Sequence, residues 1–422
     1  MRNTVHRSFT LVITAACMVV LATSVPAGKE PEREELEALF MRYDREPDGP
    51  AKDRLAARID AIAHQKHATV SRLYWHVDLD PAKAEARAQG RPILHLRMLG
   101  RLDEELSCAN SRLFRATLYA NRDVSAFLRG RFVLYWSSER PVPRVTIDFG
   151  DGRTIERTIT GNSAHYVLDE DGRVLDVLPG LYAPTVFRHE LDESLALAVQ
   201  VRGKSPTERA QLLVDHHRRG VSAAERDWQR AIAVPAVREF WQRPTPPGNE
   251  TMEFVRAQRE TVSKAGIELR GIRRIARDLA PEMPAEDQMD MWSAAGERLY
   301  GVGASQSAAV LDAASRALVG RLHNAALPEM RSTDEEVAAM VARLERSIVA
   351  DTALNQLRLR PQISREIVRR DGRIEFAALN AWIYDQVFRT PRQDPWLGLL
   401  PRDVFTGVPG DGVVSRHETG RR

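Results

Sequence analysis

The sequence predicts an α/β domain built around a mixed β-sheet with flanking helices, followed by a C-terminal all-α helical domain. Two observations lead to this fold class. Helix and strand patterns alternate between residues 75 and 197, which is typical of a sheet with flanking helices. Beyond residue 203 the apolar residues recur almost throughout at helical spacing, in segments separated by Gly, Pro, Asp and Ser. This second pattern favours a helical bundle.

Residues 1–27 have the pattern of a signal peptide. Arg2 and Arg7 precede an apolar run from 9 to 22, and small residues lead up to Ala27. The apolar run is shorter than the ~20 residues that a helix needs to cross a bilayer. We therefore expect cleavage after Ala27 and a periplasmic or secreted location.

Two other interpretations of this segment remain open. An uncleaved membrane anchor is one of them, and a lipoprotein modified at Cys17 is the other, although the apolar run continues past Cys17. Cleavage after Ala27 would remove Cys17 and leave Cys108 without a partner cysteine. An unpaired thiol is unusual in an oxidising compartment, so Cys108 is either buried or present for its chemistry.

Charge and hydropathy exclude several classes of partner. The chain carries a formal net charge of +3, and without the two arginines of the signal segment the remainder is close to neutral. This balance gives no indication of nucleic acid or an anionic surface as a partner. No later segment is apolar enough to span a bilayer, so no stable membrane span is expected after processing.

Residues 28–72 are predicted to form a helical N-terminal segment. Its apolar residues stand at helical spacing on either side of the turn at 47–50, whose sequence is Pro-Asp-Gly-Pro. A helical hairpin is the simplest structure with this pattern.

The predicted α/β domain covers residues 73–200. Helices are expected at 81–89 and at 111–128, the second interrupted near 120–121. Strands are expected at 92–98, 132–136, 144–149, 154–159, 165–168 and 174–178. The sequence Gly-Asp-Gly between the third and fourth strands predicts a β-hairpin.

The predicted helical domain covers residues 201–390. Its helices are expected at 206–219, 223–241, 252–279, 285–300, 305–323, 334–349, 351–369 and 374–388. No fixed-period repeat is evident, which disfavours a solenoid. Residues 391–422 are rich in Pro and Gly and are expected to form an irregular tail that packs through Trp396 and Leu397.

Three segments of the α/β region resemble secreted thioredoxin-like domains. The stretch from 75 to 96 (WHVDLDPAKAEARAQGRPILHL) resembles their entry, where a Trp and an Ala-rich helix precede Gly-Lys/Arg-Pro and the first core strand. In such domains a Cys-x-x-Cys motif is followed at fixed intervals by an aromatic residue, a Val and a Phe-Val pair. Tyr119, Val124 and Phe132 stand at these intervals here. Counting back from them places the motif at 108–111, where the sequence is Cys-Ala-Asn-Ser.

The third segment lies at the end of the same region. Residues 161–184 (GNSAHYVLDEDGRVLDVLPGLYAP) are similar to the family's Gly-Thr-Pro-Thr-Phe segment and the strands that follow it. Ser163 stands where the family has its cis-proline. The resemblance covers about residues 75–191 and implies a thioredoxin-like fold for this domain, and it does not extend to the helical half.

The resemblance also implies a site with a single thiol. Cys108 would cap the N-terminus of a helix, where backbone N–H groups and the helix dipole stabilise a thiolate. Ser111 replaces the resolving cysteine, so release of a mixed disulfide would need an external thiol. Ser163 replaces the proline, and cis bonds are essentially confined to proline. Cys108, Ser111 and Ser163 are the candidate catalytic residues, and efficient oxidase or reductase activity is not expected.

Two functions are compatible with this site. The first is an exported monothiol protein that binds or transiently traps thiol-bearing proteins or small thiols, and it requires an accessible Cys108. The second is a non-catalytic interaction or scaffold protein that retains a degenerate thioredoxin fold around a buried, inert Cys108. The partner, the oligomeric state and the role of the helical half are left open by the sequence.

No cofactor and no metal are predicted. A copper site formed by His95, Met98, His165 and Cys108 is the alternative, because these are soft N and S ligands. We expect instead that both histidines form hydrogen bonds within the sheet and that Met98 belongs to the core.

Two polar clusters of the helical half are interpreted as structural. The sequence Asp-His-His at 215–217 has no third ligand nearby and is expected on a solvated helix face. Asp351, Asn355, Arg358 and Arg360 are spaced for salt bridges and an amide network on one helical stretch.

Overall fold

The computed structural model describes residues 30–158, 162–242, 285–301, 310–325 and 331–390. The predicted signal peptide and the predicted tail lie outside these residues, and so does the helix expected at 252–279. No helix among the described residues has both the length and the apolar character needed to cross a bilayer.

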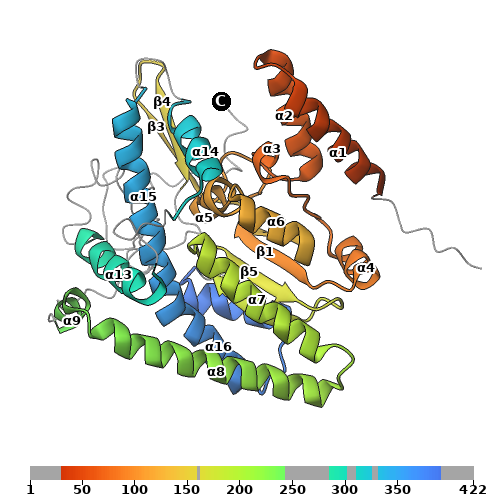
Figure 1. Ribbon diagram of the computed structural model, residues 1–422, viewed down its shortest axis with the longest axis vertical. Coiled ribbons are helices and arrows are strands. Elements are labelled where there is room, and N and C mark those ends of the chain that lie inside the picture. The colour runs from red at the N-terminus through yellow and green to blue at the C-terminus, as the bar shows by residue number, and fades with distance from the viewer. Residues whose placement is uncertain (1–29, 159–161, 243–284, 302–309, 326–330, 391–422) are drawn as a thin grey trace, which may run out of the picture.

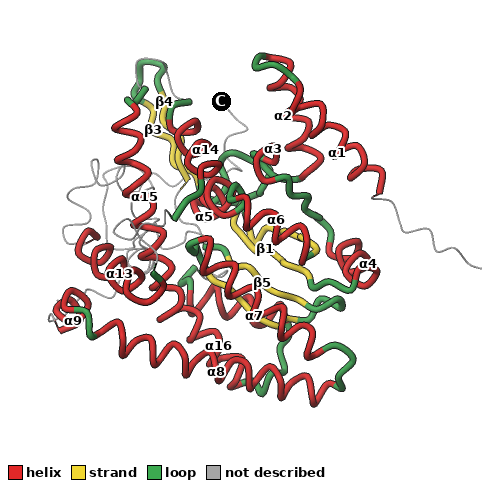
Figure 2. The backbone as a smooth tube through the Cα atoms, viewed as in Figure 1, coloured by secondary structure: helices red, strands yellow, loops and turns green. Residues whose placement is uncertain are grey.

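A four-stranded mixed sheet lies at the centre of the molecule (Figure 1, Figure 2). Its order is β2-β1-β5-β6, in which β1 is parallel to β2 and antiparallel to β5, and β5 is antiparallel to β6. The strands are β1 (Ile93–Leu99), β2 (Val133–Arg140), β5 (Ala164–Leu168) and β6 (Val174–Pro179). The strands β3 (Arg144–Asp148) and β4 (Thr154–Thr158) form a separate antiparallel hairpin. The predicted mixed sheet and hairpin are therefore confirmed.

Helices cover both faces of the sheet, and this explains why every residue of β5 and β6 is buried. On one face, His95 and Tyr166 contact Phe376 of α17 (Phe376–Trp382), with ring centroids 5.0 Å from Phe376 in each case. On the other face, His165 contacts Phe114 and Phe187, at 4.7 and 4.9 Å. The C-terminal region thus packs directly against one face of the sheet.

The helices of the α/β region begin and end at recognisable caps. Asp78 caps α4 (Leu79–Gln89), which ends at Gly90 in the left-handed conformation. The helices between β1 and β2 are α5 (Ala109–Leu113), the π-helical turn η1 (Phe114–Leu118) and α6 (Arg122–Arg131), which Asn121 caps. The helix after β6 is α7 (Pro184–Val201). The interruption expected near 120–121 is present between η1 and α6.

The N-terminal segment forms the predicted hairpin, with α1 (Glu30–Arg45) and α2 (Pro50–Ala63) on either side of the turn and α3 (Ala68–Ser71) after it. Its apolar side chains form a small cluster of their own, to which Phe40 and Ile59 belong.

The C-terminal region is helical, as predicted, but several helix bounds differ from the expected ones. The expected break near Gly220 is wrong, because one helix continues through it and ends at Ile232, so the helix expected at 223–241 is interrupted at 233–234. The expected break near 350 is wrong because helix continues from 334 to 369, and the helix expected at 305–323 begins only at Ala313 among the described residues. The elements are α8 (Pro206–Ile232), α9 (Pro235–Gln242), α13 (Ala285–Tyr300), α14 (Ala313–His323), α15 (Asp334–Leu354), η4 (Asn355–Leu359), α16 (Arg360–Arg369), α17 and η5 (Ile383–Val387).

The sheet and the C-terminal helices share one hydrophobic core. Leu379 and Ile383 belong to the same buried cluster as Leu96 and Val177 of the sheet. A core that is continuous across both regions means that the helical half is packed as part of the same folded unit.

Candidate functional site

Cys108 and Ser163 meet at one end of the sheet. Cys108 follows β1 and is the N-cap residue of α5, and its backbone N–H donates to the carbonyl of Leu99 at 3.2 Å. Ser163 directly precedes β5. Because β1 and β5 are antiparallel, the end of the first and the start of the second lie at the same edge. The Cys108 Sγ is 3.0 Å from the Ser163 Oγ.

Ser111 completes this cluster from the first turn of α5. The Cys108 Sγ lies 3.4 Å from the Ser111 Oγ, and this hydroxyl lies 2.8 Å from the Cys108 carbonyl oxygen. The structure therefore brings together the three residues that the sequence singled out. No peptide bond of the described residues is cis.

Two further residues adjoin the cluster, and sequence reasoning gave them no role of this kind. The Ser107 Oγ lies 2.7 Å from the Ser111 Oγ. Arg115 is only 2 % exposed and donates to the carbonyls of Leu102 and Glu104 and to Ser107 Oγ, at 3.0, 2.6 and 3.2 Å. Burial lowers the pKa of Arg115 to about 10, so it remains charged at neutral pH. Arg115 thus fixes the loop before Cys108 through backbone carbonyls.

The thiol is sealed from solvent. Cys108 has 0 % exposed surface, and so have Ser107, Ser111 and Ser163. Of the two alternatives that the sequence leaves open for Cys108, accessible or buried, the structure has the buried one. Local sequence cannot indicate this burial, because residues that pack beside the site belong to a segment more than 200 positions away from Asn162.

The segment that contains α17 and η5 packs against the backbone next to Ser163, and we call this segment the cover. The Tyr384 hydroxyl donates to the carbonyl oxygen of Asn162, the residue before Ser163, at 3.1 Å. The Asn162 side chain in turn donates to the carbonyl oxygen of Phe388 at 3.0 Å. Burial raises the pKa of Tyr384 well above its ordinary value, so its hydroxyl remains protonated as a donor. The backbone edge beside Cys108 is therefore occupied by the chain itself.

A buried polar chain fixes this segment to the sheet. Asn380 accepts a hydrogen bond from the Tyr166 hydroxyl and donates to Glu139, both at 2.9 Å. Glu139 is also paired with Arg97 at 2.7 Å. Both the oxygen and the nitrogen of the Asn380 amide therefore have a partner on the sheet.

Apolar burial shows that the cover is not a lid. The side chains of Leu379, Ile383, Tyr384, Val387 and Phe388 are all buried. At ~1.5–3 kcal/mol for each large apolar side chain, exposing them would cost on the order of 10 kcal/mol. This equals the total stability of a typical domain, roughly 5–15 kcal/mol. Exposure of Cys108 by release of the whole segment is therefore comparable to unfolding.

The two histidines considered for copper lie on strands of the sheet, and each is hydrogen-bonded at Nε2. The His95 Nε2 is 2.7 Å from the Ser137 Oγ of β2, and the His165 Nε2 is 2.7 Å from the hydroxyl of Tyr119, which lies outside the sheet. The Nδ1 atoms of both rings are buried without a partner among the described residues. Burial lowers the pKa of His165 to about 3, so the ring is neutral. Within the described ranges, neither histidine forms a close group of metal ligands with Cys108.

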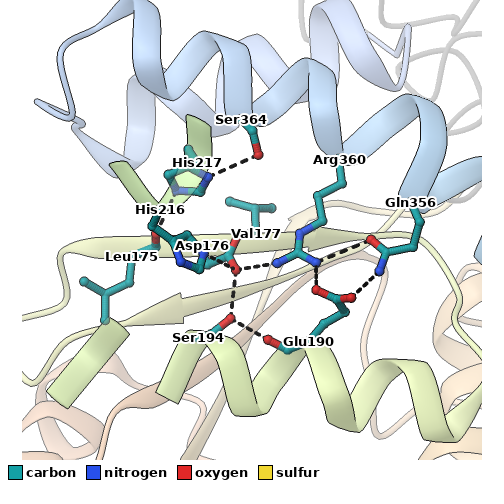
Figure 3. A network of polar contacts seen from close by, with 10 residues as sticks. All are labelled: Leu175, Asp176, Val177, Glu190, Ser194, His216, His217, Gln356, Arg360 and Ser364. Atoms are coloured by element: carbon teal, nitrogen blue, oxygen red, sulfur yellow. Dashed lines mark hydrogen bonds and ion pairs between the residues drawn. The ribbon is translucent and has the colours of Figure 1, made fainter. Parts of the chain in front are cut away.

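A second polar cluster lies between the sheet and the helical region (Figure 3). Asp176 of β6 accepts at Oδ2 from Arg360 Nη2 at 2.7 Å and from Ser194 Oγ at 2.8 Å, and His216 Nε2 is 3.5 Å away. His216 and the buried His217 therefore do not lie on a solvated face, and that expectation is wrong. The partner that buries them comes from a strand that is distant in sequence.

His217 in this cluster forms hydrogen bonds through both of its ring nitrogens. The His217 Nε2 is 3.0 Å from the carbonyl oxygen of Leu175, and its Nδ1 is 3.1 Å from the Ser364 Oγ. Burial lowers the pKa of His217 to about 4. The neutral ring therefore donates through Nε2 and accepts through Nδ1.

Asp176, His216 and His217 are grouped closely enough to hold a metal ion, but their bonding does not suit one. The Oδ2 atom of Asp176 already faces three partners, one of which is the guanidinium of Arg360. Burial alone would raise the pKa of Asp176, but Arg360 and His216 hold it well below its ordinary value. The cluster is a buried ion-pair network that joins the sheet to the helices.

Arg360 extends this network to α7, where it forms an ion pair with Glu190. The Gln356 side chain also donates a hydrogen bond to the Glu190 carboxylate. The predicted structural role of the 351–360 stretch is therefore confirmed for Arg360. It is also confirmed for Asn355, whose side chain donates to the carbonyl oxygen of Leu181 at 2.7 Å.

No protein-family model, curated protein or solved structure matches this chain. Its function is therefore inferred from the geometry of its own residues.

Proposed function

We propose that this chain is an exported protein that uses a degenerate thioredoxin-like domain as a non-catalytic platform for interaction. The observation that carries the proposal is the complete burial of Cys108, at a site where the chain's own C-terminal helices bond to the residue before Ser163. Export is proposed from the signal-peptide pattern of residues 1–27.

The proposed relation to thioredoxin-like domains is supported by connectivity. The parallel strands β1 and β2 are joined through helices, and the antiparallel strands β5 and β6 follow and lead into the helix α7. A thioredoxin-like core has the same arrangement, with β3 and β4 here as an insertion. Cys108 at a helix start and Ser163 before the third sheet strand occupy the places that the sequence resemblance assigns to the motif and to the proline loop.

The absence of catalysis follows from how thiol exchange works. A thiolate must approach the partner's sulfur directly, so both access and orientation are required. The Cys108 Sγ has no exposed surface and is held by two hydroxyls. The backbone carbonyl of Asn162, beside which an extended partner would lie, already accepts from Tyr384. Neither a thiol-bearing protein nor a small thiol can reach the sulfur in this conformation.

A second candidate, the monothiol function, is favoured by one observation. Cys108 is the residue at the N-terminus of α5, and the charged Arg115 lies under the same loop. A helix N-terminus and a nearby cation both stabilise a thiolate. Thiol-bearing proteins or small thiols would be the partners, and trapping them would require the cover to be displaced first.

Oxidised glutathione and the variant Ser111→Cys distinguish the two functions. The platform proposal predicts no glutathione adduct on the native chain by mass spectrometry and insulin reduction at background rate for both the wild type and Ser111→Cys. Cys108→Ser is the control, since it removes the thiol and leaves the fold. A glutathione adduct on the native wild type would establish the monothiol function instead, and turnover by Ser111→Cys would contradict the platform proposal by showing that partners reach position 108.

A further inference from the structure

The β3–β4 hairpin has one apolar face. Ile147 lies directly opposite Ile155, and cross-strand neighbours of this kind share a face. Phe149 and Val145 continue the same face, since side chains alternate along a strand. Phe149 is 52 % exposed and Ile155 is 38 % exposed. The hairpin strands pair only with each other within the described part of the chain.

The opposite face of the hairpin is polar. Thr146 lies opposite Glu156, and Asp148 lies opposite Thr154. An isolated two-stranded hairpin is only marginally stable in water, and exposed apolar side chains gathered on one face usually mark a surface that is covered by something. The asymmetry of the two faces therefore calls for an occupant on the apolar one.

The described chain ends at the base of this hairpin. Arg140 Nη2 donates to the carbonyl oxygen of Thr390, the last described residue, at 3.4 Å. Arg140 is the last residue of β2, and β3 begins at Arg144. Residues 391–422 therefore continue from a point next to the hairpin. Residues 391–395 alone can span up to ~17 Å, which matches the ~17 Å rise of a five-residue strand.

The segment that follows has the matching chemistry. Within ten residues it carries the apolar side chains Trp396, Leu397, Leu399, Leu400, Val404 and Phe405. The same face of the hairpin also carries Arg157 opposite Val145 and Arg153 opposite Phe149, and Arg153 is paired with Asp151. We propose that residues 396–405 of this same chain dock on the apolar face of the β3–β4 hairpin.

A pair of cysteine variants tests this proposal. The full-length chain with Cys17→Ser and Cys108→Ser receives Leu399→Cys together with either Ile155→Cys or Thr154→Cys. Residues 154 and 155 are neighbours that face opposite sides of the hairpin, so the tether to residue 399 is the same in both. We expect the intramolecular disulfide to form about tenfold faster with Ile155→Cys, since docking raises the local concentration on that face only.

Two results of this experiment would overturn the proposal. Equal rates for the two pairs would mean that the tail is not held on the apolar face. A disulfide that joins two chains, and whose rate rises with protein concentration, would mean that a second copy occupies the face.

Hydrogen exchange provides a measurement without cysteines. In the chain that ends at Thr390, the amides of residues 144–158 should exchange about tenfold faster than in the full chain, because the docked segment no longer protects the hairpin. Unchanged exchange in the truncated chain would also overturn the proposal, even if the cysteine variants failed to fold.

Discussion

The Cys108 Sγ lies 3.0 Å from the Ser163 Oγ, and neither side chain has any exposed surface. The thiol and Ser163 therefore hydrogen-bond to each other. Thiol exchange requires a sulfur that a partner can reach. Here both side chains are buried, and Tyr384 bonds to the backbone of the residue before Ser163.

The hydroxyl of Tyr384 should hold the cover in place. Tyr384→Phe removes the donor to the Asn162 carbonyl and leaves that buried acceptor unpaired. We expect a loss of about 1–3 kcal/mol in the free energy of unfolding, measured by urea denaturation. Tyr43→Phe in the N-terminal hairpin is the control and should change stability by less than about 0.5 kcal/mol. A Tyr384→Phe variant as stable as the control would show that the hydrogen bond does not secure the segment.

The ion pair of Asp176 and Arg360 should couple the sheet to the helices. Arg360→Met leaves the buried Asp176 carboxylate without its guanidinium, and Asp176→Asn leaves Arg360 with Glu190 as its remaining carboxylate partner. Removing one partner of a buried ion pair costs up to about 3–5 kcal/mol. In the double variant, the free energy of unfolding should fall by less than the sum of the two single decreases, and the difference should be at least about 1 kcal/mol. Asp151→Asn, at an exposed pair with Arg153, is the control and should leave the free energy of unfolding nearly unchanged. Strict additivity in the double-mutant cycle would contradict the coupling.

The stability of the chain should fall in acid because of His217. Burial lowers the pKa of this ring from 6.5 to about 4, so the unfolded chain binds a proton that the folded chain does not. The contribution is fully present above pH 6.5 and is lost as the pH falls toward 4, by about 3 kcal/mol in total.

Denaturation between pH 7 and pH 4 measures this effect. His217→Asn should reduce the pH dependence by about one proton, and the exposed His189→Asn should leave it unchanged. The pH dependence of stability that remains in His217→Asn comes from other buried histidines such as His165. Burial lowers the pKa of His165 to about 3. An unaltered slope in His217→Asn would mean that this ring does not titrate as described.

Export should leave a defined N-terminus. If residues 1–27 are removed after Ala27, the mature protein begins at Gly28 and contains Cys108 as its only cysteine. Intact-mass measurement of the protein recovered from the exported fraction tests this. A product that retains Cys17 would favour the anchor or lipoprotein alternatives.

The sequence predicted the elements of the sheet because their signals are local. The hairpin turn at Gly-Asp-Gly and the short apolar runs of the strands depend on neighbouring residues. Gly220 led to a helix break that is not present, because a local signal is here outweighed by the rest of the helix. A glycine within a helix costs only about 1 kcal/mol, and α8 continues through this position, where a side chain would meet open space.

The candidate site was predictable in part. The resemblance brought Cys108, Ser111 and Ser163 together on paper, and the structure has them in contact. The cover over them was not predictable, because it depends on contacts between residues that are 222 and 226 positions apart, Tyr384 with Asn162 and Asn162 with Phe388. The burial of His217 was missed in the same way, since its partner Leu175 belongs to a distant strand.

The rate at which iodoacetamide alkylates Cys108 tests the central claim most directly. A sealed thiol reacts only through opening of the fold, so its labelling rate should rise at least a hundredfold when denaturant unfolds the chain. Cys108→Ser should fold normally, with stability within about 1.5 kcal/mol of the wild type, because its hydroxyl can join the same hydrogen bonds. If Cys108 in the native chain is instead alkylated as fast as in the unfolded chain, the site is open and the platform account is wrong.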